Sequence, residues 1–343
     1  MAVSIASRLG TGSPDPPLLL VLLADGQLRS GEWLAKELNV SRAAVWKGVE
    51  RLRAFGLQVQ ALPRRGYRLS RPVELLDAQR IGVELGPQRL ARVRTLELKF
   101  EVDSTNTRLL AAVPPPPGRA DICLSEIQHS GRGRRGRRWI APFGSGIAVS
   151  VAWTFGDGVR TLPALSLAVG VAASRGLARA GARGISLKWP NDIWFQDRKI
   201  GGVLIELRAE AGGPAHVVIG LGLNVALTPA ARREIEAQGG RVAAAADACT
   251  AAPSRNLVAG AILDEVLSML AQFEHGGFAA FRDEWSALDA LRGRPVRVVL
   301  ANAAISGTAR GVDQEGALLL DTGDGVQRFV SGEASLRVIE GDT

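Results

Sequence analysis

The chain has 343 residues, 46% of them hydrophobic, which is enough for two or three domains with sizeable cores. Its net charge of +8 is unevenly placed: residues 1–72 carry 11 Lys/Arg against 5 Asp/Glu, residues 128–139 add five arginines and no acid, and the remainder has a net charge of −3. Isolated cysteines and histidines argue against a disulfide framework or a metal site, and the longest apolar run, 162–174, is too short to cross a membrane, so we expect a cytoplasmic protein without a membrane partner.

Residues 18–72 have the pattern of two helices followed by a hairpin. Ser30 and Ser41 are placed as N-caps, and after the second cap apolar residues recur at helical spacing: Val45, Val49 and Leu52. Residues 57–70 form two strand-like pieces around Pro-Arg-Arg-Gly. This order is typical of a winged helix-turn-helix. We expect residues 1–17 to be a disordered extension.

The clustered positive charge of this region suggests a DNA-binding surface. In a winged helix-turn-helix the second helix enters the major groove. The residues expected to reach phosphates and base edges are Ser41, Arg42 and Lys47 in that helix, and Arg64, Arg65 and Arg68 in the wing. The alternative is a small helical interaction domain with a solvated basic face, but the charge and the order of elements favour DNA.

Residues 73–291 alternate strands and helices, as in a mixed α/β core. The expected elements are strands at 93–102, 120–128 and 144–155, a short helix capped by Asp103 or Ser104, a long buried helix at 162–181, two strands around one tight turn within 185–210, a strand at 215–227, and helices from 256 to 291. Residues 292–343 contain short alternating segments with glycine turns. That pattern is consistent with an SH3-like barrel.

The segment "SGRGRRGRRW" (130–139) places five arginines among Gly131, Gly133 and Gly136. These glycines match G-x-G-x-x-G, but a dinucleotide fingerprint requires a helix that starts among them. Pro142 and the surrounding glycines exclude that helix. The segment suits a mobile loop whose backbone and arginines close on a polyanion. Taken alone, it could equally be an exposed charged loop with no fixed ligand.

"KWPND" (188–192) places a lysine and an aspartate on either side of a turn, although a surface hairpin would give the same pattern. Together with "DSTN" (103–106), "EIQHSGRGRRGRRW" (126–139), "KIGGVLIE" (199–206) and "GLGLN" (220–224), it forms five motifs in one order. In this order the chain closely resembles biotin–protein ligases. It resembles in particular the bifunctional bacterial form, which is also the biotin-operon repressor.

The resemblance implies an α+β chain with an N-terminal winged helix-turn-helix (18–72), a central class II synthetase-like ligase domain (73–291) and a C-terminal SH3-like β-barrel (292–343). It also implies ATP, biotin and Mg²⁺ as substrates and cofactor. The implied partners are a biotin carboxyl carrier protein, operator DNA of biotin genes and a second copy of the chain, which would dimerise when the adenylate is bound.

The same resemblance assigns site residues. The implied biotin ligands are Ser104, Thr105, Asn106, Gln128, Arg132, Gly133, Arg134 and Lys188. Catalysis would involve Lys188, Arg132 and Arg134. The residues beside the adenylate would be Gly131, Arg135, Arg137, Trp139, Asn191 and Asn224.

The chemistry of a carboxylate ligase fits these residue types, because a carboxylate must be activated before an amine can displace its oxygen. Attack on the α-phosphorus of ATP concentrates charge on phosphate oxygens, which cations stabilise. Two alternatives remain at this point: a ligase for another carboxylate cofactor such as lipoate, and a biotin-responsive transcription factor without catalysis. The helix-turn-helix argues against the first and the intact Lys188 against the second.

Overall fold

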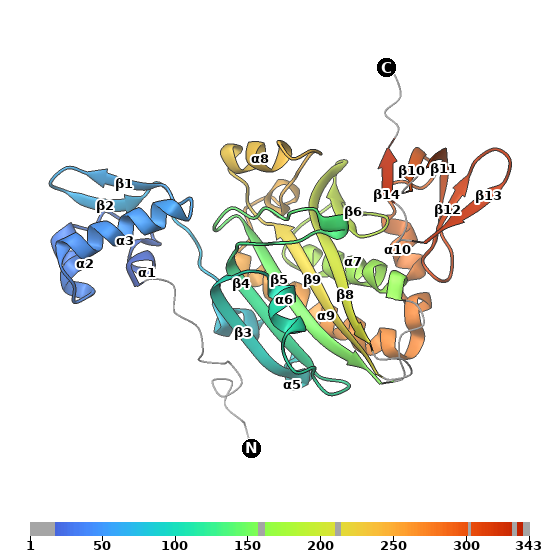
Figure 1. Cartoon of the computed structure of the whole chain (residues 1–343), viewed down its shortest axis with the longest axis horizontal. Coiled ribbons are helices and arrows are strands. Elements are labelled where there is room, and N and C mark those ends of the chain that lie inside the picture. The colour runs from blue at the N-terminus through green and yellow to red at the C-terminus, as the bar shows by residue number, and fades with distance from the viewer. Residues whose placement is uncertain (1–17, 157–161, 210–213, 301–302, 331–334, 339–343) are drawn as a thin grey trace.

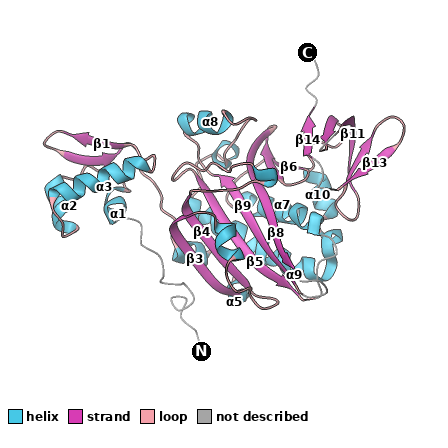
Figure 2. Ribbon diagram, viewed as in Figure 1, coloured by secondary structure: helices cyan, strands magenta, loops and turns pink. Residues whose placement is uncertain are grey.

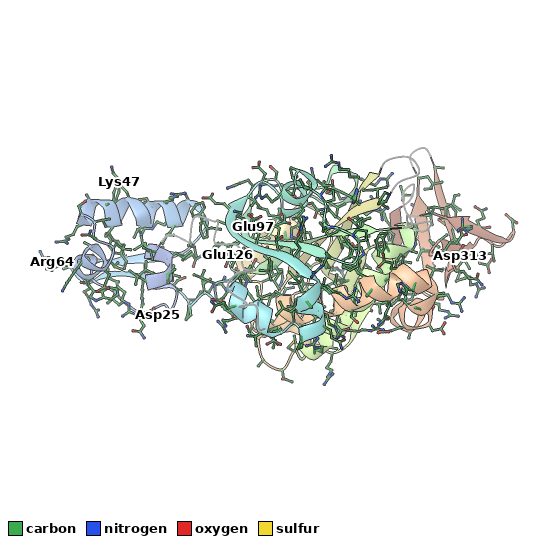
Figure 3. All side chains as sticks on the ribbon, turned by 90° about the horizontal axis from the view of Figure 1, so that it is seen from below. Asp25, Lys47, Arg64, Glu97, Glu126 and Asp313 are labelled. Atoms are coloured by element: carbon green, nitrogen blue, oxygen red, sulfur yellow. The ribbon has the colours of Figure 1, made fainter. Side chains whose placement is uncertain are left out.

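The computed structural model describes residues 18–156, 162–209, 214–300, 303–330 and 335–338, so the extension expected at residues 1–17 lies outside the described residues. In chain order the molecule has a helical N-terminal part with a hairpin, a large central sheet with helices, and a small C-terminal sheet (Figure 1). The N-terminal and C-terminal parts lie at opposite ends of the molecule in both views (Figures 1 and 3).

The N-terminal part is the predicted winged helix-turn-helix. It consists of α1 (Leu18–Leu23), α2 (Gly31–Glu37), α3 (Arg42–Ala54), β1 (Val59–Leu62) and β2 (Gly66–Leu69). Both predicted caps are present: the hydroxyl oxygen of Ser30 accepts from Trp33 N at 3.0 Å, and that of Ser41 accepts from Ala44 N at 3.1 Å. Helix α1 was not predicted. Its leucines pack into the same core as the stripe of α3, so tertiary burial stabilises this six-residue helix.

Aromatic packing joins this part to the central one. The ring of Phe55, at the end of α3, lies 5.5 Å from that of Phe100 in an edge-to-face arrangement, and Phe100 lies 6.0 Å from Phe143. At the rim of the contact, Arg51 and Glu101 form an ion pair at 3.1 Å. The N-terminal part therefore rests directly on the central part.

A buried ion pair anchors the segment that connects the two parts. Arg255 and Glu126 lie 2.8 Å apart with side chains only 5% and 4% exposed. Glu126 also accepts from Leu76 N at 2.6 Å, and Arg255 donates to the carbonyl of Glu74 at 2.7 Å. The connecting segment is thus held against the strand that leads to Gln128.

The central sheet has seven strands within the described residues, in the order β3-β4-β5-β9-β8-β7-β6. Only β3 and β4 are parallel, and every other neighbouring pair is antiparallel, so the sheet is mixed. The bounds are β3 (Val93–Val102), β4 (Ala120–Gln128), β5 (Gly146–Phe155), β6 (Ile185–Lys188), β7 (Asp192–Phe195), β8 (Arg198–Ala209) and β9 (Ala215–Asn224).

The prediction of two strands within 185–210 was wrong, because three strands lie there. The second turn was missed. It is a two-residue connection at Gln196 and Asp197, both at positive φ (49° and 58°), which matches the twist of a tight hairpin. Since neither residue is glycine or asparagine, the composition of the turn gave no signal of it.

Helices cover both faces of the sheet (Figure 2). The long helices α7 (Leu162–Arg179) and α9 (Arg255–Gly276) pack together on one face, and α6 (Thr105–Leu110) lies on the other against β4, β5 and β9. The remaining helices are α4 (Ala78–Val83), α5 (Pro87–Arg92), α8 (Pro229–Glu236) and α10 (Arg282–Leu288), with 3₁₀ turns at Arg134–Gly136, Ala245–Ala248 and Gly277–Ala280. Residues 255–280 are long and apolar enough to span a membrane, but 72% of the apolar window is buried, as expected of a core helix.

In the part of the C-terminal region that the structure describes, the predicted SH3-like domain is a five-stranded antiparallel sheet in the order β13-β12-β11-β10-β14. Its strands are β10 (Pro295–Val299), β11 (Ala304–Val312), β12 (Leu318–Asp321), β13 (Val326–Phe329) and β14 (Ser335–Val338). The ring nitrogen of Trp189 donates to the carbonyl of Gly316 at 3.1 Å, which fixes this domain to the turn after Lys188.

Candidate active site

The glycines of "GLGLN" open space above the sheet. Along β9, Leu221 and Leu223 are buried in the main core, whereas Gly220 and Gly222 line a cavity on the other face. A Cβ on Gly220 would come within 2.4 Å of the Asn106 side chain, and one on Gly222 within 2.4 Å of the Trp139 ring. The missing side chains therefore let α6 and the arginine segment approach the strand.

The start of α6 forms one wall of this cavity. Ser104 is the N-cap, and Thr105 and Asn106 follow with only 3% of each residue exposed. The side-chain oxygen of Gln128 accepts from Thr105 N at 2.8 Å and from its hydroxyl at 3.1 Å. From the sheet below, the Ser150 hydroxyl approaches Thr105 Oγ1 at 2.7 Å and Asn106 Oδ1 at 2.5 Å. These polar groups form a fixed hydrogen-bonding surface.

The arginine segment folds back on itself rather than forming a helix. The backbones of Arg132 and Arg138 pair as an isolated antiparallel β-bridge. Gly133 N donates to Arg137 O at 2.7 Å, and Trp139 N donates to Gly131 O at 2.8 Å. Gly136 has φ +72°, which the tight turn requires. Figure 1 shows this connection between β4 and β5 crossing above the ends of β9 and β8. The only helical turn in it is the short Arg134–Gly136 segment, so the nucleotide-fingerprint reading is excluded.

Glu206 connects the arginine segment with α6. Its Oε1 and Oε2 both accept from an Arg132 guanidinium nitrogen at 3.0 Å, and Oε2 also accepts from Asn106 Nδ2 at 2.7 Å. Asn106 is therefore oriented from both sides, by Ser150 and by Glu206. The "KIGGVLIE" motif contains Glu206, but nothing in the sequence pairs it with an arginine 74 residues away.

Lys188 lies at the other wall, at the end of β6. Its Nζ is 4.6 Å from the centre of the Trp194 ring. Burial lowers the pKa of Lys188, while the nearby Asp192 carboxylate opposes that effect. Asp192 itself forms an ion pair with Lys199 at 2.6 Å. Two lysines thus face the same cavity, and only one was predicted.

The cavity has a volume of about 830 Å³. It brings together residues from four predicted motifs that lie far apart in the sequence: Ser104, Thr105, Asn106, Gln128, Arg132, Gly133, Arg134, Arg135, Arg137, Trp139, Lys188, Asn191 and Asn224. Gly131 lies outside the lining; it is buried and pairs with Trp139. Asn191 donates to Val203 O at 2.6 Å and Asn224 to Ala243 O at 3.1 Å, so both amides also shape the cavity wall.

Sequence reasoning missed several basic residues of the lining: Lys199, Arg241 and Arg337. Arg337 comes from β14, so the C-terminal sheet completes the cavity. Among the described residues there is no group of three or more His, Cys, Asp or Glu that could hold a metal ion.

The predicted DNA contacts lie on the N-terminal part, outside this cavity. Arg42, Lys47, Arg64 and Arg65 are all exposed, whereas the Ser41 hydroxyl is engaged as the helix cap. Arg68 is also exposed and donates to Gln60 at 2.8 Å. Figure 3 shows Lys47 on the outer side of α3 and Arg64 at the tip of the hairpin. We refer to these five exposed cations as the basic surface of the N-terminal part.

Comparisons with known proteins agree with this arrangement. Family models match a helix-turn-helix domain at residues 18–68, the biotin/lipoate A/B protein ligase family at 99–224, and the biotin protein ligase C-terminal domain at 292–337. The bifunctional ligase/repressor BirA of Escherichia coli is 37% identical over 325 residues, covering 95% of this chain and 98% of the relative. That of Bacillus subtilis is 27% identical, covering 91% and 95%.

Among solved structures, the biotin protein ligase of Aquifex aeolicus in complex with biotin and ATP superposes with a TM-score of 0.60 at 27% identity, covering 71% of this chain and 99% of that one. The combination of the full-length likeness, the three matched domains and the cavity lined by the central and C-terminal parts leads to one conclusion: this chain belongs to the biotin–protein ligase family, in its bifunctional ligase/repressor form.

Proposed function

We propose that the chain activates biotin with ATP and transfers it to a lysine of a biotin carboxyl carrier protein, the biotin-bearing component of acetyl-CoA carboxylase. One observation carries this proposal: a single cavity joins a fixed polar wall at α6 with a set of cations at Arg132, Arg134 and Lys188. A bicyclic urea group needs the first feature, and a carboxylate reacting with a triphosphate needs the second.

In the first step, an oxygen of the biotin carboxylate attacks the α-phosphorus of ATP and pyrophosphate leaves. The ureido head of biotin would bind Ser104, Thr105, Asn106 and Gln128. Arg132, Gly133 and Arg134 would surround its carboxylate and the phosphate, and the ammonium of Lys188 would stabilise the charge of the transition state. Gly131, Arg135, Arg137, Trp139, Asn191 and Asn224 are proposed to lie beside the adenylate or to support that wall.

Mg²⁺ would accompany the ATP phosphates. Its ordinary protein ligands at phosphate sites are one or two carboxylates, and Asp192 and Asp197 line the cavity. Bound there, it would neutralise phosphate charge. The residues of the cavity therefore suit a Mg²⁺ ion that arrives bound to ATP, rather than a metal ion held by the protein alone.

In the second step, the amine of the acceptor lysine attacks the acyl carbonyl, AMP leaves and a proton is lost. Water would compete for the same anhydride, so closure of the arginine segment over the cavity protects the intermediate. The test is incubation of the protein with ATP, equal concentrations of biotin and lipoate, and a carrier domain, followed by intact-mass measurement. One added biotin per acceptor lysine supports the proposal; addition of lipoate in preference to biotin, or no addition, contradicts it.

We further propose that the chain represses biotin genes in the cytoplasm as a homodimer, with the adenylate as corepressor. A monomer offers one α3 helix, whereas an inverted repeat offers two half-sites about one helical turn apart. Ligand occupancy would act through the dimer population, because the cavity and the basic surface belong to different parts of the chain. Binding to an inverted repeat upstream of biotin genes should tighten with biotin plus ATP. Equal affinity for that site and for random DNA in both conditions would contradict it.

A further inference from the structure

An apolar side chain is exposed on α3 beside two cations of the basic surface, Arg42 and Lys47. Trp46 lies in α3 with 54% of the residue exposed, although indole is the largest apolar group the helix carries. On the same helix Val45 and Val49 are at most 1% exposed. Helix α3 is capped and regular, and its buried residues are Val45, Val49 and Leu52. The helical periodicity therefore places Trp46 outside the buried stripe, and local disorder is not the reason for its exposure.

The charges around Trp46 are those of an anion-binding surface. Arg42 lies one helical turn before it and Lys47 directly follows; both are exposed. The acid one turn after it, Glu50, forms an ion pair with Arg53 at 2.6 Å, which compensates its charge. The exposed face of α3 is therefore positive with an apolar centre. A protein partner with an apolar patch would meet uncompensated cations here, whereas a DNA groove offers phosphates at its rims.

We propose that Trp46 is a specificity-determining DNA contact, whose indole packs against the 5-methyl group of a thymine in the major groove. This inference rests on the proposed repressor function and names how its surface distinguishes sequences. The major groove accommodates an α-helix, and the thymine methyl is its apolar marker. Arg42, Lys47 and Arg64 supply positive charge that attracts the phosphates of any DNA sequence. The Trp46 indole would make an apolar contact only with a base pair that carries the thymine methyl group, and this contact would distinguish sequences.

The experiment uses the full-length protein with biotin, ATP and Mg²⁺, and a duplex enriched by that protein from a random library. Trp46→Ala should weaken binding to the enriched duplex by about 10-fold or more, the range of losing one base contact. Its affinity for random DNA and the slope of log K against log salt should stay as in the wild type, since an apolar contact releases no counterion. The matched variant Arg42→Ala should instead reduce the slope by about one.

A methyl-deletion series then identifies the contact directly. Replacing each thymine of the enriched duplex by deoxyuridine removes only the methyl group. The wild type should lose affinity at one position per half-site, and Trp46→Ala should be insensitive at that same position. Trp46→Phe should recover part of the discrimination because it retains an aromatic face. Unfolding midpoints and biotin transfer should match the wild type in all three variants, since Trp46 lies outside the cavity lining.

Three outcomes would overturn the inference. If Trp46→Ala binds the enriched duplex as tightly as the wild type while Arg42→Ala does not, the proposed Trp46 contact is contradicted, whereas the proposed DNA binding is supported. If sedimentation shows that Trp46→Ala fails to dimerise without DNA, the indole belongs to an interface between copies. If no duplex is enriched at all, the inference falls together with the proposed DNA binding.

Discussion

The guanidinium of Arg132 is bound by the carboxylate of Glu206, with a nitrogen 3.0 Å from each carboxylate oxygen. The same carboxylate accepts from Asn106 at 2.7 Å. One acidic side chain therefore holds both the arginine segment and the α6 wall of the cavity. A substrate carboxylate that engages Arg132 would meet a guanidinium that is already oriented.

Removing the charge of Glu206 should loosen the arginine segment when no ligand is bound. In Glu206→Gln the ion pair with Arg132 is replaced by a weaker hydrogen bond from the charged guanidinium to a neutral amide oxygen. Trypsin cleavage between Arg132 and Arg138, followed by mass spectrometry, should become faster than in the wild type, and biotin plus ATP should restore protection. Cleavage rates that are identical in both proteins without ligand would show that Glu206 does not anchor the segment.

Arg134 tests the role of the segment after adenylate formation. Arg134→Ala removes a cation from the cavity lining, so the adenylate should dissociate faster and biotinylate unrelated proteins in a mixture. Arg328→Ala is a suitable control, because Arg328 forms its ion pairs with Asp313 and Glu315 in the C-terminal domain and does not line the cavity. Equal retention times of the adenylate on Arg134→Ala and the control would contradict a wrapping role.

Lys188→Ala should retain the fold and lose at least about 100-fold in the rate of adenylate formation, which is the usual effect of removing one group that stabilises developing charge. The measurement is pyrophosphate release. The control Lys36→Ala removes an exposed lysine of α2 and should leave the rate unchanged. A near-normal rate in Lys188→Ala would remove this residue from the reacting centre.

The alkaline limb of the rate profile should also depend on Lys188. Burial lowers the pKa of this lysine below its ordinary value of 10.5. Since the cationic form is the active one, the rate should fall as pH rises through that lowered pKa. In Lys188→Arg the guanidinium stays charged, so the alkaline limb should move to higher pH even if the maximal rate is reduced. An unchanged alkaline limb would assign the titration to another group.

The buried pair Arg255–Glu126 should contribute strongly to stability. Arg255→Met leaves Glu126 without its cation and should lower the free energy of unfolding by about 3–5 kcal/mol. Replacing both residues by methionine should recover much of that loss, because no buried charge is then unpaired. The exposed pair Arg310–Asp321 is the control, for which Arg310→Ala should cost about 1 kcal/mol or less. Denaturant unfolding of the three variants measures these differences; a loss below that of the control would contradict the assignment.

Sequence patterns predicted an element correctly where interactions between nearby residues of the chain stabilise it. The caps at Ser30 and Ser41 and the stripe at Val45, Val49 and Leu52 fixed two helices from sequence alone. Helix α1 and the turn at Gln196 were missed because tertiary burial and hairpin twist, rather than residue propensity, stabilise them. The short helices α4, α5 and α8 were also not predicted, because each is too short to show apolar residues repeating at helical spacing.

The site shows the same division. Its motif residues were identified through the family resemblance, and the structure brings all of them except Gly131 to one cavity. Glu206, Lys199 and Arg337 were not singled out, because their relevance depends on which distant segment each one meets. Arg337 reaches the cavity from the C-terminal sheet, and no spacing rule connects it with Lys188.

The central claim is that this cavity makes the biotin adenylate and retains it. The most direct test is a single-turnover experiment with biotin, Mg²⁺ and ATP labelled at the α-phosphate, without a carrier protein. We expect a burst of about one pyrophosphate per chain, with the label eluting on the protein during gel filtration and leaving as AMP only when a carrier domain is added. Absence of the burst, or a label that elutes free of the protein before any carrier is present, would contradict the account.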